Sequence, residues 1–304
     1  MTSHSPHRDR SVAVAALGAM FIASSGVLVR LSASTPVTVA FYRCLYALPV
    51  LGALTLLEER SLGRLPVRAR QLSWAAGVFF AIDLIFWHHA IAAVGAGLAT
   101  VLGNLQVVIV GFVAWLLLKE RPQTSLFIAV PVVLAGVVLI SGVTGGEAYG
   151  EDPTAGVIFG IATSLAYAAF LLILRQGSRD LTRVAGPLFH ATLSSTVTAA
   201  VYGLVAGGAE WAPAWPEHGW LVTLALSAQV GGWLLISRSL PRLPAAVTSV
   251  VLLLQPVGAM LLAAVTLGEE PGPAQLAGAA MVLAGVLIAT RGRSRPAEVA
   301  PQPA

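Results

Sequence analysis

Two ionisable side chains lie inside long apolar stretches of the sequence, Arg43 in "FYRCLYAL" and Asp83 in "FFAIDLIFW". At a helical rise of about 1.5 Å per residue, Asp83 lies about 13 Å and Arg43 about 10 Å from the nearer ends of their stretches. Ionisable groups in apolar surroundings are costly and usually face a cavity or one another. The two residues are therefore candidates for binding a proton or a charged solute. An ion pair that only locks two helices together is the competing interpretation.

Seven further side chains in such stretches can hydrogen-bond to a solute or stack against it: Trp87, His88, Asn104, Gln106, Tyr167, Gln229 and Gln255. Amides at this depth also join neighbouring helices, so both interpretations stay open. His88 and His89 are adjacent and point about 100° apart, which prevents them from chelating one metal ion. Nucleotide-binding, zinc-protease and serine-hydrolase motifs are missing, and Cys44 is the only cysteine. We therefore predict that the protein is not an enzyme and that it has no catalytic residue, metal site or cofactor.

Two further carboxylates, Glu120 and Glu269, each end an apolar stretch. The negative end of a helix dipole disfavours a carboxylate there. We therefore expect each to reach the N-terminus of another helix, where unpaired N–H groups accept it, and to steady a gate. A solvated loop acid is the alternative interpretation.

The elements that hold these residues are predicted to be membrane-spanning helices. The chain is 57% hydrophobic and 11% charged, with a mean hydropathy of +0.82, unlike a soluble domain. Apolar runs of about 20 residues can cross a hydrocarbon core of roughly 30 Å, and a helix satisfies its own backbone there. Ten such runs are predicted, at 12–31, 36–57, 72–92, 97–118, 125–141, 155–174, 186–206, 217–237, 245–267 and 274–290.

The sequence contains an internal duplication. The pentapeptide VLAGV occurs at Val133–Val137 and again 149 positions later. The same offset aligns Gln106 with Gln255 and Glu120 with Glu269, with 13 identities over 42 ungapped positions. Matched Gln and Glu beside apolar runs are much rarer by chance than matched Leu, so we interpret the pattern as two repeats.

Charge predicts how the helices are oriented. With a cytoplasmic N-terminus, 16 of the 18 Lys and Arg residues fall in cytoplasmic segments, while the opposite loops are acidic. By the positive-inside rule both termini are then cytoplasmic, and the net charge of +4 requires no nucleic-acid partner. The basic residues are Arg8, Arg10, Arg60, Arg64, Arg68, Arg70, Lys119, Arg121, Arg175, Arg179, Arg183, Arg238, Arg242, Arg291, Arg293 and Arg295.

Five spans per repeat is an odd number, so the second repeat enters the membrane inverted. Inverted repeats are typical of transporters whose central site opens alternately to each side. The first run is expected to remain as a span, because it is longer than the apolar core of a signal peptide. The predicted division is an N-terminal tail (1–11), a first repeat (12–141), an external linker (142–154), a second repeat (155–290) and a C-terminal tail (291–304).

The residues resemble a known family. "LQVVIVGFVAWLLLKERP" followed by "VLAGVVLI", and "LQPVGAMLLAAVTLGEEP" followed by "VLAGVLIA", are similar to the EamA repeat of the drug/metabolite transporter superfamily. Arg43 also matches an arginine early in the family's second helix. Pro256 matches the proline after the family's glutamine, whereas the first repeat has Val107. The resemblance implies ten helices around a central cavity and export of amino acids, related metabolites or toxic compounds.

The predicted protein is an all-α polytopic membrane protein with ten transmembrane helices in two inverted five-helix EamA repeats. Its predicted function is secondary-active export by alternating access, with proton coupling as a hypothesis. The predicted location is a plasma membrane, which the family resemblance implies is a bacterial inner membrane. Its expected partners are the lipid bilayer and a small-molecule substrate. Facilitated diffusion or exchange is the nearer alternative, and a non-transporting membrane sensor or intramembrane enzyme the more distant one. The sequence leaves substrate identity and oligomeric state open.

Overall fold

The computed structural model describes residues 6–120, 122–140, 152–267 and 271–291, which form helices and no strands. The all-α prediction is confirmed. The elements are α1 (Pro6–Ser32), α2 (Pro36–Leu62), α3 (Val67–Asn104), α4 (Gln106–Leu118), α5 (Thr124–Ile140), α6 (Pro153–Gly177), α7 (Ala185–Ala206), α8 (Glu217–Leu224), the π-helix η2 (Ala225–Gly232), α9 (Trp233–Ser239), the short 3-10 helix η3 (Leu240–Arg242), α10 (Ala245–Leu252), α11 (Leu254–Leu267) and α12 (Pro273–Arg291).

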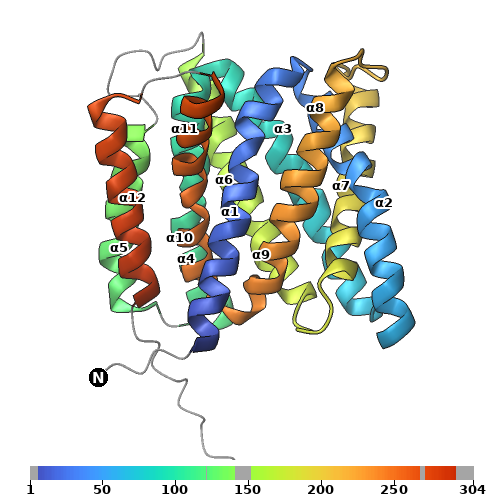
Figure 1. Cartoon of the computed structure of the whole chain (residues 1–304), viewed down its shortest axis with the longest axis horizontal. Helices are drawn as coiled ribbons and strands as arrows, with labels where there is room; N and C mark the ends of the chain where they lie inside the picture. The colour runs from blue at the N-terminus through green and yellow to red at the C-terminus, as the bar shows by residue number, and fades with distance from the viewer. Residues whose placement is uncertain (1–5, 121, 141–151, 268–270, 292–304) are drawn as a thin grey trace, which may run out of the picture.

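The helices form one bundle in which they run roughly side by side (Figure 1). Nine helical segments among the described residues are long and apolar enough to cross a membrane, and the 17-residue α5 is a shorter apolar helix at the place of the fifth span. The eighth span combines α8, η2 and α9, and the ninth combines α10 and α11. The start of α1 and the end of α12 lie at the same face, as an even number of spans requires (Figure 1).

Several predicted boundaries differ from the structure, including the end of α2 at Leu62 and the start of α3 at Val67. Helix α1 begins at Pro6, inside the predicted tail, and α3 continues to Asn104 through the predicted gap between the third and fourth spans. A Cβ atom on Gly103 would nevertheless lie 3.8 Å from Cδ1 of Trp87, whereas sixteen residues of straight helix would separate them by about 24 Å. The chain therefore folds back between these two residues, and two spans remain.

Helices α2 and α7, the second helices of the two repeats, pack antiparallel. Near the end of α2, Glu58 contacts Val184 and Ala185 at the start of α7. At the opposite end, Thr35 Oγ1 before α2 donates to the Gly208 carbonyl after α7 at 2.6 Å. Contacts at both ends fix the antiparallel arrangement that inverted repeats require.

The repeated pentapeptides belong to α5 and α12, which lie side by side at one edge of the bundle (Figure 1). A Cβ atom on Gly136 would lie 2.7 Å from the Gly278 carbonyl oxygen, and one on Gly278 would lie 2.6 Å from the Gly136 carbonyl oxygen. Gly285, 149 positions after Gly136, packs in the same way against Val133. The pentapeptide thus recurs because each copy supplies the small residues that let the other helix approach closely.

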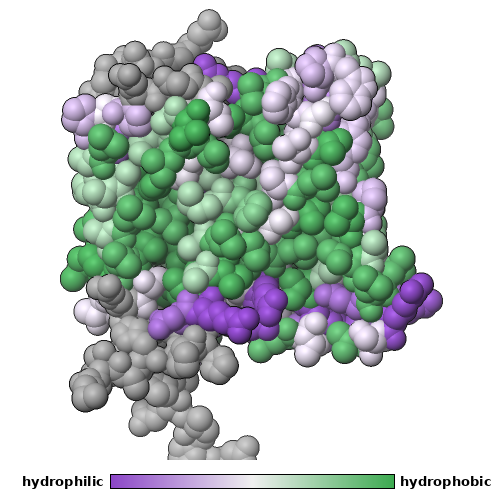
Figure 2. Space-filling view, viewed as in Figure 1, coloured by the Kyte–Doolittle hydropathy of each residue, from purple (hydrophilic) through white to green (hydrophobic). Residues whose placement is uncertain are grey.

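The surface has the banding of a membrane protein. Figure 2 shows a broad hydrophobic belt above a hydrophilic band along the lower edge. Leu117 and Phe127 are 70% and 69% exposed, which suits contact with lipid. The face that carries the Arg-rich ends of the spans (Arg60, Arg64, Arg179, Arg238 and Arg242) is called the basic face below.

Candidate functional site

The fourth and ninth spans are both interrupted within the membrane, at Leu105 and Leu253. In each, the backbone N–H bonds to a carbonyl three residues back, of Leu102 and Val250 respectively, at 3.1 Å. A turn tightened in this way leaves nearby carbonyl groups without their usual helical partners. The two breaks lie at nearly equivalent places of the two repeats, which is a typical setting for a solute site in transporters.

Side chains from other helices bond to the carbonyl groups at these breaks. The Ser249 carbonyl accepts from Gln106 Nε2 at 3.5 Å, and Ser164 Oγ of α6 donates to the carbonyls of Leu102 and Gly103. Gln106 is 1% exposed, and its Oε1 atom has no hydrogen-bond partner in the described part of the chain. Gln106 therefore joins the fourth span to the ninth at the level of both breaks.

The π-helix η2 carries Gln229, which is 1% exposed. Its Oε1 accepts from Arg43 Nε at 3.0 Å, and its Nε2 donates to Thr192 Oγ1 at 3.1 Å. The chain of bonds links α2 of the first repeat to α7 and η2 of the second. π-helical segments recur at functional sites, and this one places an amide beside a buried cation.

Arg43 is buried, with 6% of its surface exposed, and its guanidinium carbon lies 5.6 Å from the centre of the Phe80 ring. Only Nε has a partner: neither Nη atom donates to a residue that the structure describes. Two of the three guanidinium nitrogens are thus left for a ligand, and their planar fork matches a carboxylate.

Asp83 lies on α3 one turn from Phe80 and is 8% exposed. It is close enough to Arg43 for their charges to interact, but these two described residues form no ion pair. The locking ion pair considered from the sequence is therefore not formed, because Arg43 bonds to Gln229 instead. Thr163 Oγ1 of α6 donates to the Asp83 carbonyl oxygen at 3.5 Å.

Four aromatic rings pack beside Arg43. Phe80 stacks on Phe170 with ring centres 4.5 Å apart, and Trp233 meets Phe170 edge-on at 4.8 Å. Tyr167 lies 6.3 Å from Trp233, and its side chain is near that of Gln255. Trp233 is 1% exposed, and no described residue accepts from its Nε1. The cluster gives the site an apolar wall with one further hydrogen-bond donor.

Three further predicted candidates, Trp87, His88 and Asn104, lie on α3. Trp87 is partly buried near Gly103, and Asn104 ends α3 beside the first break. His88 bonds through Nδ1 to the Leu84 carbonyl of its own helix at 2.6 Å. Arg43, Asp83, Tyr167, Gln229 and Gln255 thus gather at one place. His88 is near enough to Arg43 for their charges to interact, although its Nδ1 atom is bonded within its own helix.

Four members of the cluster, Phe80, Phe170, Thr192 and Trp233, were not among the candidates predicted from the sequence. Phe80 precedes Asp83 by three residues and shares its helix face, a signal that the sequence did contain. Thr192 is one of many hydroxyls in an apolar helix, where such groups usually bond to their own backbone. Only its distance to Gln229 distinguishes it.

Glu120 accepts a hydrogen bond from the backbone N–H of Ala245, the first residue of α10, at 3.0 Å. Its other oxygen pairs with Arg175 Nη1 at 2.5 Å, and Arg175 also donates to the carbonyls of Leu240 and Leu243. Glu120 is thus at the N-terminus of another helix, the contact expected for it. Its predicted counterpart Glu269 lies outside the described residues.

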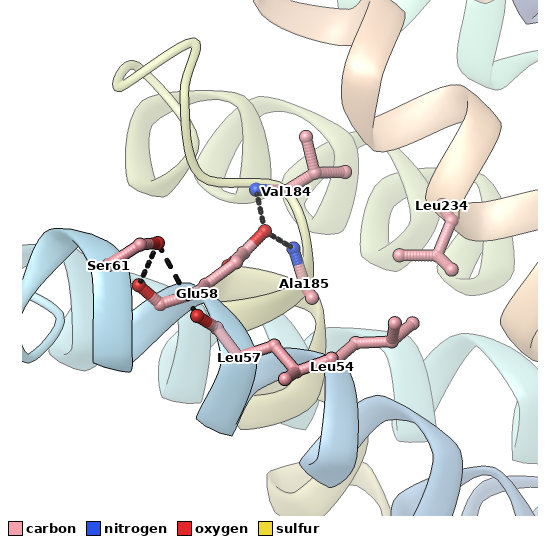
Figure 3. A pocket seen from close by; sticks show the side chains of 7 residues that line it. All are labelled: Leu54, Leu57, Glu58, Ser61, Val184, Ala185 and Leu234. Atoms are coloured by element: carbon pink, nitrogen blue, oxygen red, sulfur yellow. Dashed lines mark hydrogen bonds between the residues drawn. The ribbon is translucent and has the colours of Figure 1, made fainter.

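A second such carboxylate, Glu58, was not predicted. Val184 and Ala185 donate to its Oε1 and Gly186 to its Oε2, each at 2.8 Å. Figure 3 shows Glu58 on α2 reaching the start of α7, beside an open pocket. The pocket lies between α2, α7 and α9 and is lined by Leu54, Leu57, Glu58, Ser61, Val184, Ala185 and Leu234.

Comparison with solved structures and curated proteins gives related chains. A solved crystal structure superposes with a TM-score of 0.79 at 17% identity, covering 93% of this chain and 96% of that chain, which shows the shared fold. The uncharacterized transporter YwfM of Bacillus subtilis (strain 168) is 24% identical over 227 residues, 71% of this chain and 72% of that protein. An uncharacterized transporter of Archaeoglobus fulgidus is 26% identical over 175 residues, 58% of this chain and 60% of that protein.

The family comparison covers both halves of the chain. The sequence model of the EamA-like transporter family matches residues 10–142 and again residues 154–291. The two matched segments agree with the two repeats derived from the 149-residue offset. The chain belongs to the EamA-like transporter family and is a multi-pass membrane transporter.

Proposed function

We propose that this transporter exports amino acids or related small carboxylates by alternating access, and that Arg43 binds the substrate carboxylate. The single observation that carries the proposal is the buried guanidinium of Arg43, fixed through Nε by Gln229 and with both Nη atoms free of described partners. A bidentate carboxylate would satisfy both Nη atoms. Export as the direction rests on the family resemblance, and the basic face is taken as cytoplasmic by the positive-inside rule.

The place of Arg43 in the fold supports this assignment. Arg43 belongs to the first repeat, whereas Gln229 and Thr192 belong to the second. A site formed across the interface of two inverted repeats can be exposed to either side by rocking one repeat against the other. The aromatic wall formed by Phe170 and Trp233 then suits an apolar substrate side chain.

Asp83 gives the proposed site an acid beside the cation. In the proposed mechanism its carboxylate binds either the ammonium group of an amino acid or a proton that drives export. Both roles use the same property, a buried carboxylate with no ion-pair partner among the described residues. Intramembrane acids of this kind form proton relays in many transporters.

The proposal is tested by a metabolite screen of culture medium. Medium from cells lacking the protein is compared with medium from cells that overproduce the wild type or Arg43→Gln. Excess of one or a few carboxylate-bearing metabolites with the wild type, absent with Arg43→Gln at equal protein level, supports it. A wild-type excess confined to solutes without a carboxylate, or unchanged in Arg43→Gln, contradicts it.

A further inference from the structure

Glu58 joins the two repeats at the basic face. One carboxylate accepts from three consecutive backbone N–H groups, of Val184, Ala185 and Gly186, each at 2.8 Å. These N–H groups have no partner within α7, and they form the positive end of its dipole. Glu58 itself lies in the last turns of α2, whose own dipole disfavours it. Its position is therefore stabilised by α7 and not by its own helix.

Arg183 completes this contact with the opposite charge. Its Nη1 donates to the Gly63 carbonyl at 2.7 Å and its Nη2 donates to the Leu62 carbonyl, both at the end of α2. A cation on the carbonyl end of one helix and an anion on the N–H end of its counterpart are both favourable. Glu58 and Arg183 together form what we call the α2–α7 clamp.

Glu120 and Arg175 form a second clamp, between the fourth and ninth spans, in which the cation pairs with the acid itself and not with the end of the first-repeat helix. Glu120 accepts from the first N–H of α10, and Arg175 pairs with Glu120 and donates to the Leu243 carbonyl just before α10. In both clamps an acid near the end of a first-repeat helix holds the N-terminus of the counterpart helix in the second repeat. Both act at the basic face.

The other end of the α2–α7 pair has no charged clamp among the described residues. Thr35 donates to the Gly208 carbonyl, and the Glu210 N–H donates to Thr38 Oγ1 at 2.7 Å. The carboxylate of Glu210 is exposed and bonds to no described residue. Charge-assisted hydrogen bonds are roughly twice as strong as neutral ones, so the pair is held more tightly at the basic face.

We propose that Glu58 is a gate-positioning residue whose carboxylate keeps the basic face closed by holding the start of α7 against the end of α2. Loss of these bonds lets α7 move away from α2 beside the pocket of Figure 3. The proposal rests on the proposed function, because a gate presupposes a transported solute. Its test, however, measures accessibility and needs no substrate.

Ser237 of α9 provides the reporter position. It is 2% exposed and lies one turn after Trp233 on the same helix face, between the aromatic wall and the basic face. Ser237→Cys in a Cys44→Ser background is labelled with a membrane-impermeant maleimide in nanodiscs, where both faces are open to reagent. The rate is measured with Glu58, with Glu58→Gln and with Glu59→Gln. Glu59 is the matched control, because it is the next acid on α2 and the three N–H groups at the start of α7 donate to Glu58 and not to it.

Glu58→Gln should speed labelling of the Ser237→Cys reporter roughly tenfold or more, since one carboxylate receives three charge-assisted bonds. Glu59→Gln should leave the rate unchanged. Native Cys44 is fully buried and should stay unlabelled in Glu58→Gln without the reporter. Equal rates in Glu58→Gln and the parent, or labelling of Cys44 as well, would overturn the gate assignment in favour of packing alone.

A variant that keeps the negative charge provides a second test in case Glu58→Gln does not fold. Glu58→Asp shortens the side chain by one methylene, so it should raise the labelling rate to a value between those of the parent and Glu58→Gln. If only Glu58→Asp reaches the membrane, a rate equal to the parent contradicts the proposal. If reporter labelling is faster but no carboxylate is transported, the proposed function is contradicted and the gate is not. If carboxylates are transported but labelling is unchanged, the gate is contradicted and the proposed function is not.

Discussion

At the scale of single residues, the central site depends on how one cation is held. Gln229 binds the Nε atom of Arg43 and so orients the guanidinium, and Phe80 covers it. The ionisable members of the site could be predicted, because charge in an apolar stretch is visible in sequence. Their partners could not. Whether Arg43 pairs with Asp83 or Gln229 depends on side-chain positions set by three different helices.

Asp83→Asn tests whether this acid couples export to proton entry. The amide keeps the size and most hydrogen bonds but cannot bind or release a proton. We expect loss of substrate accumulation driven by a pH gradient in inside-out vesicles, with exchange of substrate for substrate retained. Glu210→Gln, at an acid that is exposed outside the spans and whose carboxylate bonds to no described residue, is the control. Undiminished gradient-driven accumulation in Asp83→Asn would assign the residue to packing.

At the scale of elements, the spans could be predicted and their interruptions could not. Hydropathy locates the helices because each must be long and apolar. The break at Leu105 occurs beside Val107, where the second repeat has Pro256, so proline is not required for it. The breaks and η2 depend on bonds from Ser164, Gln106 and other side chains of neighbouring helices. Glu58 was missed because its three donors lie about 126 residues further along the chain.

Glu120→Gln tests the clamp between the fourth and ninth spans. The substitution removes the ion pair to Arg175 and weakens the bond to Ala245, contacts to charged groups that are each worth about 1.5–3 kcal/mol. Both partners are partly exposed, so solvent screening lowers the ion pair's share. We expect transport to fall about tenfold at matched protein level. Glu210→Gln should transport like the wild type, and wild-type transport in Glu120→Gln would make Glu120 an ordinary loop acid.

Glu269→Gln is expected to behave like Glu120→Gln, because Glu269 is the equivalent residue of the second repeat.

At the scale of the whole molecule, the structure is organised by the duplication. The equivalent glycines Gly136 and Gly285 make equivalent contacts between α5 and α12, so the axis relating the repeats passes between these helices. The alignment of rare residues predicted the duplication, and the odd number of spans in each repeat predicted the inverted arrangement. The sequence could not show which contacts of one repeat are missing from the equivalent place in the other repeat. The clamped basic face and the neutral opposite end of α2 and α7 are visible only in the structure.

The orientation in the membrane is predicted by the basic residues alone. Single cysteines are placed at Ala214 and at Arg179, both exposed and at opposite faces, in a Cys44→Ser background. A membrane-impermeant maleimide added to intact cells should label the Ala214→Cys variant, and the Arg179→Cys variant only after the membrane is opened. The reverse pattern would place the basic face outside and invert the proposed direction of gating.

The most direct test of the account is competition for transport by purified protein in proteoliposomes. A panel of radiolabelled L-amino acids is offered to liposomes loaded with the same unlabelled compounds, with each methyl ester as the competitor that lacks a carboxylate. With a carboxylate site at Arg43, the wild type should exchange at least one amino acid, the methyl ester of that amino acid should compete about tenfold less well, and Arg43→Gln should exchange none. Equal competition by acid and ester, or exchange by Arg43→Gln at the wild-type rate, would contradict a carboxylate site at Arg43.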